Sequence, residues 1–140
     1  MATVAALRRL VRRRLRAVVP GPPLRGAQLE LMRVIEQQPG IGIAAAGRVL
    51  VLAANTVSTL VDQLIDLGML VRDTDPNDRR AARLWLTKAA TQRLAAGRQA
   101  RAELMAGVVA GLSVAEREAL AQALPALRAL LAALDPGDGR

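Results

Sequence analysis

Residues 55–87, "NTVSTLVDQLIDLGMLVRDTDPNDRRAARLWLT", contain the pattern that decides the fold. The first part repeats apolar residues at helical spacing, and Gly68 supplies the left-handed residue that ends many helices. "MLVRDT" and "ARLWLT" then have the pattern of two strands, joined by "DPNDRRA", which has the proline and Asn/Asp chemistry of a turn. The segment therefore predicts a helix followed by a β-hairpin.

Helical patterns lie on both sides of this segment. "PGPP" and "PG" end the first two helices, because proline interrupts helical hydrogen bonding. Ser113 and Glu116 form a capping box that starts the last helix, and Pro125 predicts a kink or break within it. The predicted helices cover residues 4–19, 26–38, 43–50, 54–67, 88–112 and 113–134. The fold class is mainly α with a small β-hairpin, in the order of a winged helix-turn-helix.

The composition argues against catalysis. The 140 residues include no cysteine and no histidine, which excludes disulfides, thiolate metal sites and the commonest general base. The carboxylates form no obvious pair in an apolar pocket. We therefore expect a single domain that is not an enzyme and has no cofactor or metal.

The chain is strongly basic, with a net charge of +8 and Lys88 as its single lysine. This excess favours a polyanionic partner, although a GC-rich bacterial genome would also enrich arginine. Residues 1–25 hold seven arginines and no acid. Those arginines have three open interpretations: ion pairs with a partner subunit, non-specific attraction to DNA, or a solvated face opposite an apolar stripe.

Polar side chains occupy the early turns of the helix at 54–67. Asn and Gln suit adenine, while Ser and Thr suit phosphates or bases, so this helix has the composition of a DNA-reading helix. A solvated polar face is the alternative. The candidate residues are Asn55, Thr56, Ser58, Thr59 and Gln63.

Arginines also mark the predicted hairpin. Arg79 and Arg80 lie at its tip, where an arginine can enter a narrow minor groove. Arg72 and Arg83 lie on the strands and can contact phosphates or form structural ion pairs. Trp85, the one aromatic residue, is predicted on the outer face of the hairpin with Leu84 and Leu86 on the inner face.

The helix ending in leucine and glycine, then "LVR", the "DRRA" turn and the strand closing in "LT", resemble the MarR-type family of bacterial transcription regulators. The resemblance implies a winged helix-turn-helix protein that binds DNA as a homodimer through its N- and C-terminal helices. It also implies that Arg80 enters the minor groove, that Asp78 orients it, and that Arg79 faces phosphates. The chain departs from the family pattern at Ala46–Gly47, Ala53 and Ala90.

Taken together, residues 1–140 are expected to form one MarR-like domain. Residues 26–87 would be the winged lobe, and residues 1–25 and 88–134 the dimerisation helices. The expected function is sequence-specific regulation, with repression favoured, by a homodimer on a pseudo-palindromic duplex operator. A non-specific nucleoid-type protein and an interaction adaptor that keeps the fold are the alternatives.

The remaining expectations concern location and ligands. No segment approaches the roughly 20 apolar residues of a membrane span, and the arginine-rich start lacks the apolar stretch of a twin-arginine signal. We therefore expect a cytoplasmic protein without a membrane partner. Any effector pocket would be aliphatic, so the effector is expected to be a small apolar ligand, or absent.

Overall fold

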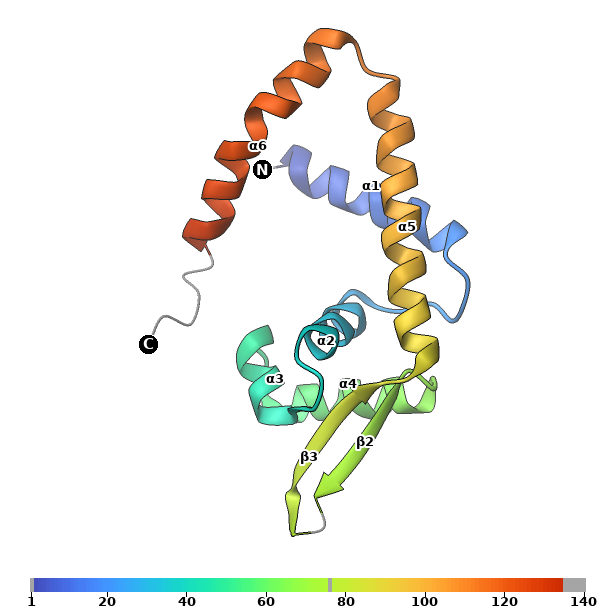
Figure 1. The fold of residues 1–140 in the computed structure, drawn as a ribbon, viewed down its shortest axis with the longest axis vertical. Coiled ribbons are helices and arrows are strands. Elements are labelled where there is room, and N and C mark those ends of the chain that lie inside the picture. Colours follow the sequence, from blue (N-terminus) through green and yellow to red (C-terminus); the bar gives the residue numbers. More distant parts are fainter. Residues whose placement is uncertain (1, 76, 135–140) are drawn as a thin grey trace. The chain divides into compact units, whose positions relative to one another are not determined.

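The computed structural model describes residues 2–75 and 77–134, without the side chains of Asp75, Asp78, Arg79 and Arg80. The chain divides into two compact units, residues 1–101 and 102–140. The first contains most of the helices and all the strands in the described part of the chain (Figure 1). The boundary lies within helix α5 (Lys88–Ala110).

Four helices precede the hairpin. They are α1 (Ala2–Val18), α2 (Gly26–Gln37), α3 (Ile43–Leu50) and α4 (Ala54–Asp66). Every boundary lies within two residues of its predicted position, which confirms these four predictions. Gly68 adopts a φ of 70° directly after α4, as predicted for a helix-ending glycine.

The strands form one antiparallel sheet in the order β1-β3-β2. β2 (Leu70–Asp75) and β3 (Asp78–Leu86) are the predicted hairpin, which projects from the helices as a long two-stranded arm (Figure 1). β1 (Ile41–Gly42) was not predicted; Ile41 pairs with Leu84 far along the chain. A two-residue strand leaves no periodicity, and its partner cannot be inferred from nearby sequence.

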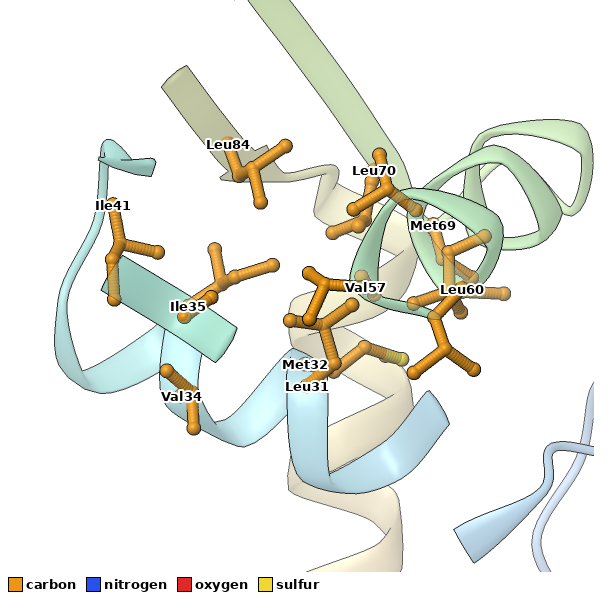
Figure 2. Packing of buried hydrophobic residues seen from close by; sticks show 14 of the residues in the cluster. Leu31, Met32, Val34, Ile35, Ile41, Val57, Leu60, Met69, Leu70 and Leu84 are labelled. Carbon is orange, nitrogen blue, oxygen red and sulfur yellow. The ribbon is translucent and has the colours of Figure 1, made fainter. Parts of the chain in front are cut away.

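Apolar side chains from α2, α4 and the sheet form the core of the first unit (Figure 2). The predicted inner face of α4 is buried, since Val57, Val61 and Leu64 have no exposed surface and Leu60 is 9% exposed. Strand parity is also as predicted, with Leu84 buried and Trp85 39% exposed. Burying each such aliphatic side chain stabilises the fold by about 1.5–3 kcal/mol. This core fixes α4 and the hairpin on one scaffold.

The connection between α3 and α4 depends on close backbone approach at Gly47. Leu52 donates its N–H to the carbonyl oxygen of Gly47 at 2.8 Å. A Cβ atom on Gly47 would lie 2.8 Å from the carbonyl oxygen of Leu52. A side chain at this position would therefore force the backbone of the turn to shift.

Val51 ends α3 in the left-handed conformation, with φ 55° and ψ 45°. Its side chain is 88% exposed, so little packing offsets the strain of a β-branched residue in this region. Replacing Val51 with glycine is expected to raise the free energy of unfolding by about 1 kcal/mol. Chemical denaturation measures this change, and a Val51→Gly variant no more stable than wild type would show that the turn is unstrained.

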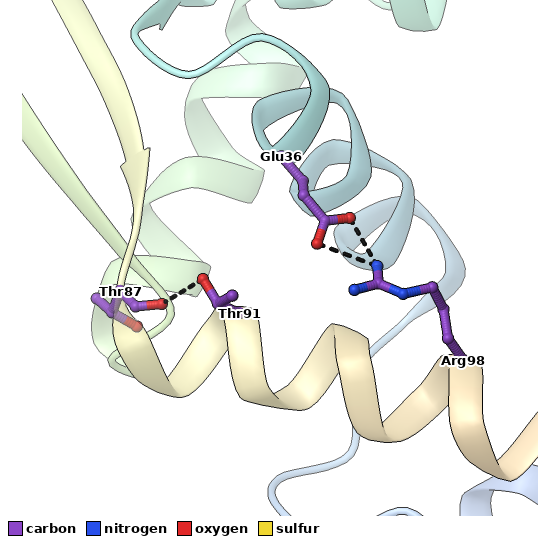
Figure 3. Close-up of polar contacts among 4 residues, drawn as sticks. All are labelled: Glu36, Thr87, Thr91 and Arg98. Atoms are coloured by element: carbon purple, nitrogen blue, oxygen red, sulfur yellow. Dashed lines mark hydrogen bonds and ion pairs between the residues drawn. The ribbon is translucent and has the colours of Figure 1, made fainter.

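Two arginines of α5 tie the neighbouring elements together. Arg93 donates to the carbonyl oxygens of Val19, Pro20 and Pro22, so it holds the connection between α1 and α2. Partial burial lowers the pKa of Arg93 from its ordinary value. Arg98 donates to both carboxylate oxygens of Glu36 on α2, at 3.0 and 2.8 Å (Figure 3).

Hydrogen bonds of Thr87 link the end of the hairpin to the start of α5. Its hydroxyl donates to the carbonyl oxygen of Gly68 at 2.7 Å and accepts from the N–H of Ala90 at 3.2 Å. Its carbonyl oxygen accepts from the hydroxyl of Thr91 (Figure 3). Ala90 is fully buried, so the alanine found there in place of glycine packs into the core.

The second unit holds the end of α5 and helix α6 (Val114–Leu134). The predicted capping box is present: Glu116 accepts from the Ser113 N–H at 2.8 Å, and Ser113 accepts from the Glu116 N–H at 3.3 Å. The hydrogen bonds from Ser113 lower the pKa of Glu116. Helix α6 continues through Pro125, so the helix does not break there, and the alternative of a kink stays a prediction. Its exposed apolar residues include Leu120, Leu124, Leu127, Leu130, Leu131 and Leu134.

Candidate nucleic-acid interface

The first turns of α4 present short polar groups. Asn55, Thr56 and Thr59 are exposed, and Ser58 is half-buried. Asn55 accepts a hydrogen bond from the Thr56 N–H through its side-chain oxygen at 2.8 Å. The amide nitrogen of Asn55 can therefore donate a hydrogen bond to a base or phosphate. Ala53, at the N-cap position, provides no side-chain cap, as its sequence predicts.

Gln63 occupies a different environment from these four residues. It is half-buried, and its side-chain oxygen accepts a hydrogen bond from the amide of Gln28 at 3.0 Å. Gln28 is 5% exposed and was not singled out from the sequence. Its spacing from Leu31, Met32 and Ile35 places it on the inner face of α2, and this spacing is the signal that could have found it.

Arg72 forms an ion pair with Asp62 of α4, with Nη2 and Oδ1 2.8 Å apart. Of the two interpretations of Arg72, the structure therefore shows the ion pair, which links β2 to α4. Arg83 is exposed on β3 and lies directly opposite Asp73 of β2. Opposite charges at directly facing positions stabilise a strand pair modestly.

The hairpin tip is described only in its backbone. Asp78, Arg79 and Arg80 belong to β3, and the register between β2 and β3 shifts at Thr74 and Asp75. The side chains of Asp78, Arg79 and Arg80 lie outside the described residues. Their predicted contacts with DNA therefore stay predictions.

A cavity of about 640 Å³ lies between α1, α2 and α5 in the first unit. Its apolar lining includes Leu7, Val11, Leu15, Leu29 and Leu94. Charged residues also line this cavity: Arg8, Arg12, Arg16, Glu30, Arg33, Glu36, Arg93, Arg98 and Arg101. An aliphatic effector pocket stays a prediction.

The arginines of α1 contribute to the positive charge of this lining. Arg8, Arg12 and Arg16 recur every four residues, so they flank the apolar stripe of α1 instead of lying opposite it. Arg33 pairs with Glu30 and Arg98 with Glu36, at 2.7 and 2.8 Å. The cavity therefore combines an apolar floor with an excess of positive charge.

Residues 2–75 and 77–134 contain neither a single helix that could span a membrane nor a cluster of metal ligands. No single helix there is both long enough and apolar enough to cross a membrane; α3 and α4 pass that test as a pair, but they are bent by 108° at their junction. No group of three or more His, Cys, Asp or Glu side chains in this part of the chain could hold a metal ion.

Helices α2 to α4, followed by a hairpin that pairs with β1, define a winged helix-turn-helix protein. Residues 24–82 match the model of the MarR family. A Thauera aromatica protein assigned as a transcriptional regulator for the hcr operon is 34% identical over 90 residues, which is 64% of this chain. The match spans about half, 54%, of that relative's length.

Solved structures show the same fold. RV1404 from Mycobacterium tuberculosis superimposes with a TM-score of 0.79 at 21% identity, covering 99% of this chain and 92% of that one. A mutant of MepR from S. aureus bound to an oligodeoxyribonucleotide gives a TM-score of 0.69 at 20% identity, covering 93% of each chain. The predicted fold class and the predicted resemblance to the MarR family are confirmed.

Proposed function

We propose that this protein is a transcription regulator that binds specific duplex DNA as a homodimer, and that it acts as a repressor. One observation carries the proposal: the exposed polar turns of α4 lie in the same lobe as the projecting β2–β3 arm. The sequence of this lobe matches the MarR family, and a MepR mutant with this fold is bound to an oligodeoxyribonucleotide.

The two elements suit different grooves. A helix of the dimensions of α4 fits the major groove, where Asn55, Thr56, Ser58 and Thr59 can reach base edges or phosphates. The hairpin is expected to bring Arg80 into the adjacent minor groove, with Asp78 orienting it and Arg79 facing phosphates. In this arrangement the wing anchors the protein, while α4 distinguishes sequences.

Exposed apolar surface supports a homodimer. Leu120, Leu124, Leu127 and Leu131 recur at helical spacing along α6, and each is about half exposed or more. In α1, Val4 and Leu7 are 64% and 54% exposed. A second copy that covers residues 1–25 and 88–134 would remove this surface from water. Light scattering at micromolar concentration should give twice the 14.8 kDa mass of the chain; a monomer would contradict the proposal.

Selection from a random duplex library tests the function as a whole. The proposal predicts enrichment of one pseudo-palindrome, because a two-fold dimer places two α4 helices on two half-sites. A nucleoid-type protein would bind without enrichment, and an adaptor would retain no duplex. Repression is tested by adding the protein to in vitro transcription from a promoter that contains the selected site, where transcript yield should fall.

The residues that line the cavity restrict the chemical class of effector that we expect. An apolar floor with an excess of arginine suits an apolar ligand that carries an anionic group, more than the purely apolar ligand expected from the sequence. Decanoate is therefore expected to raise the unfolding temperature more than decanol does, because a ligand stabilises the state that binds it.

Two neighbouring arginines provide a matched pair for this measurement. Arg12→Ala removes an arginine of the cavity lining and should reduce the decanoate effect. Arg13→Ala removes the same charge outside that lining and should leave the effect unchanged. Equal shifts with decanoate and decanol would contradict an anionic ligand, and no shift with either would favour the absence of such an effector.

A further inference from the structure

A buried amide pair joins α2 to α4. Gln28 is 5% exposed, and its side-chain oxygen accepts from the Arg25 N–H at 2.7 Å while its nitrogen donates to Gln63 at 3.0 Å. Both ends of the Gln28 amide are therefore engaged in a region of low dielectric, where hydrogen bonds are strong and directional. The apolar contacts around them decide which face of α4 is buried, and the amide hydrogen bond adds a directional contact at one flank of the helix.

The position of Gln63 is linked to the rotation of the polar first turns of α4. Thr56 and Gln63 are seven positions apart, which is about two helical turns, so both lie on one flank of the helix. A directional bond at Gln63 therefore sets where Thr56 and its neighbours Asn55 and Thr59 point. Gln63 is itself half-buried against α2, whereas these three residues are exposed.

The preceding residue, Asp62, anchors another flank of α4. Asp62 pairs with Arg72 of β2 at 2.8 Å, so adjacent positions on α4 contact the scaffold helix and the wing. This ion pair is partly exposed, with 33% of the Arg72 side chain and 66% of the Asp62 side chain accessible. The contribution of such exposed pairs to stability is small. The Gln28–Gln63 hydrogen bond, with Gln28 buried and Gln63 half-buried, is thus the more restrictive of the two contacts.

We propose that Gln63 is a positioning residue and not a base-reading one: through Gln28 it holds α4 at the rotation that presents Asn55, Thr56 and Thr59. The inference that Gln63 positions α4 depends only on the structure of the free protein. The consequence for sequence discrimination rests on the proposed DNA-binding function. The two parts have separate measurements, so that failure of one is distinguishable from failure of the other.

Hydrogen exchange in the free protein tests positioning. Gln28→Met and Gln63→Met keep the approximate side-chain size but remove the amide contact. Each should accelerate amide exchange in α4 by about tenfold relative to α2, the size of one lost hydrogen bond. Gln63→Glu retains an acceptor for Gln28 and should preserve slow exchange. Gln37→Met, at an exposed position of α2, is the control and should change nothing.

Equal acceleration in α2 and α4 would mean a general loss of stability and would contradict positioning. Unchanged exchange in α4 would contradict it as well. Both results are obtained without DNA, so they stand whether or not the protein selects a duplex. If the wild type shows no duplex preference, the proposed function is wrong while the exchange measurement still decides the role of the pair.

Binding measurements then test the consequence. Gln28 is buried within the lobe, yet Gln28→Met should lower the ratio of specific to non-specific affinity by about tenfold. Gln63→Met should lower it equally, and the double variant should lower it no further, because the contact that both changes remove is the Gln28–Gln63 hydrogen bond. A loss with Gln63→Met alone would show that Gln63 reads a base directly. A parallel fall in non-specific affinity would show damage to the fold instead.

Discussion

Replacing Arg80 with alanine is expected to weaken binding to the selected duplex by about 10- to 100-fold, because an arginine in a narrow minor groove gains from the enhanced negative potential there. The slope of log affinity against log salt should also become shallower by about one unit, since one phosphate-region contact is lost. Titrations of a labelled duplex at several salt concentrations measure both effects. The expectation rests on the position of Arg80 in the hairpin and on the family resemblance.

Removal of any arginine also lowers the net charge, so a control is needed. Arg9→Ala makes the same change in charge at an exposed position of α1, outside the winged lobe. It should lower affinity only slightly, and equally for specific and unrelated duplexes. If Arg80→Ala behaved like Arg9→Ala, the assignment of the hairpin as a DNA-contacting wing would be wrong.

Substituting Gly47 with alanine is expected to lower the free energy of unfolding by about 1–3 kcal/mol, the range for overpacked sites. The added Cβ would meet the carbonyl oxygen of Leu52 at 2.8 Å, and this backbone atom cannot rotate away as a flexible side chain would. The shift would displace the turn that sets the start of α4. Denaturant titration measures the change in stability.

Gly97 provides the matched comparison. It lies within α5, and a Cβ there would meet nothing within 4 Å. Gly97→Ala should therefore stabilise the protein by about 0.5–1 kcal/mol, the usual gain for alanine over glycine inside a helix. If Gly47→Ala lowers the free energy of unfolding and Gly97→Ala raises it, the steric constraint lies at the α3–α4 turn. Equal effects would contradict it.

Local patterns were sufficient to predict most of the fold. The 3.6-residue periodicity located α4 and its buried face, and proline and glycine located the ends of α2 and α4, because these features depend on neighbouring residues. Ser113 and Glu116 predicted the start of α6 for the same reason, since a capping box is complete within four residues. Pro125 left a kink and a break as alternatives, and the continuous α6 helix excludes only the break.

Features that depend on distant residues could not be predicted. β1 exists because Ile41 meets Leu84, and Gln63 faces the interior because Gln28 lies opposite it. The cavity acquires its charge because α1 lies against α2 and α5, which brings several arginines to one side. None of these pairings has a local signature in the sequence. The candidate DNA-binding residues could be proposed from the sequence because polar turns and paired arginines are local patterns, and their contacts with DNA stay predictions.

Sequence-specific DNA binding is tested by a ratio of two affinities, one for a selected duplex and one for a scrambled duplex. Both are measured at a single fixed salt concentration. Phosphate contacts alone depend on salt and are indifferent to sequence, whereas specific regulators prefer their sites by about 10³-fold or more. A sequence-specific homodimer should give a ratio in that range, with the preferred duplex containing two related half-sites. A ratio near one at every salt concentration would contradict it.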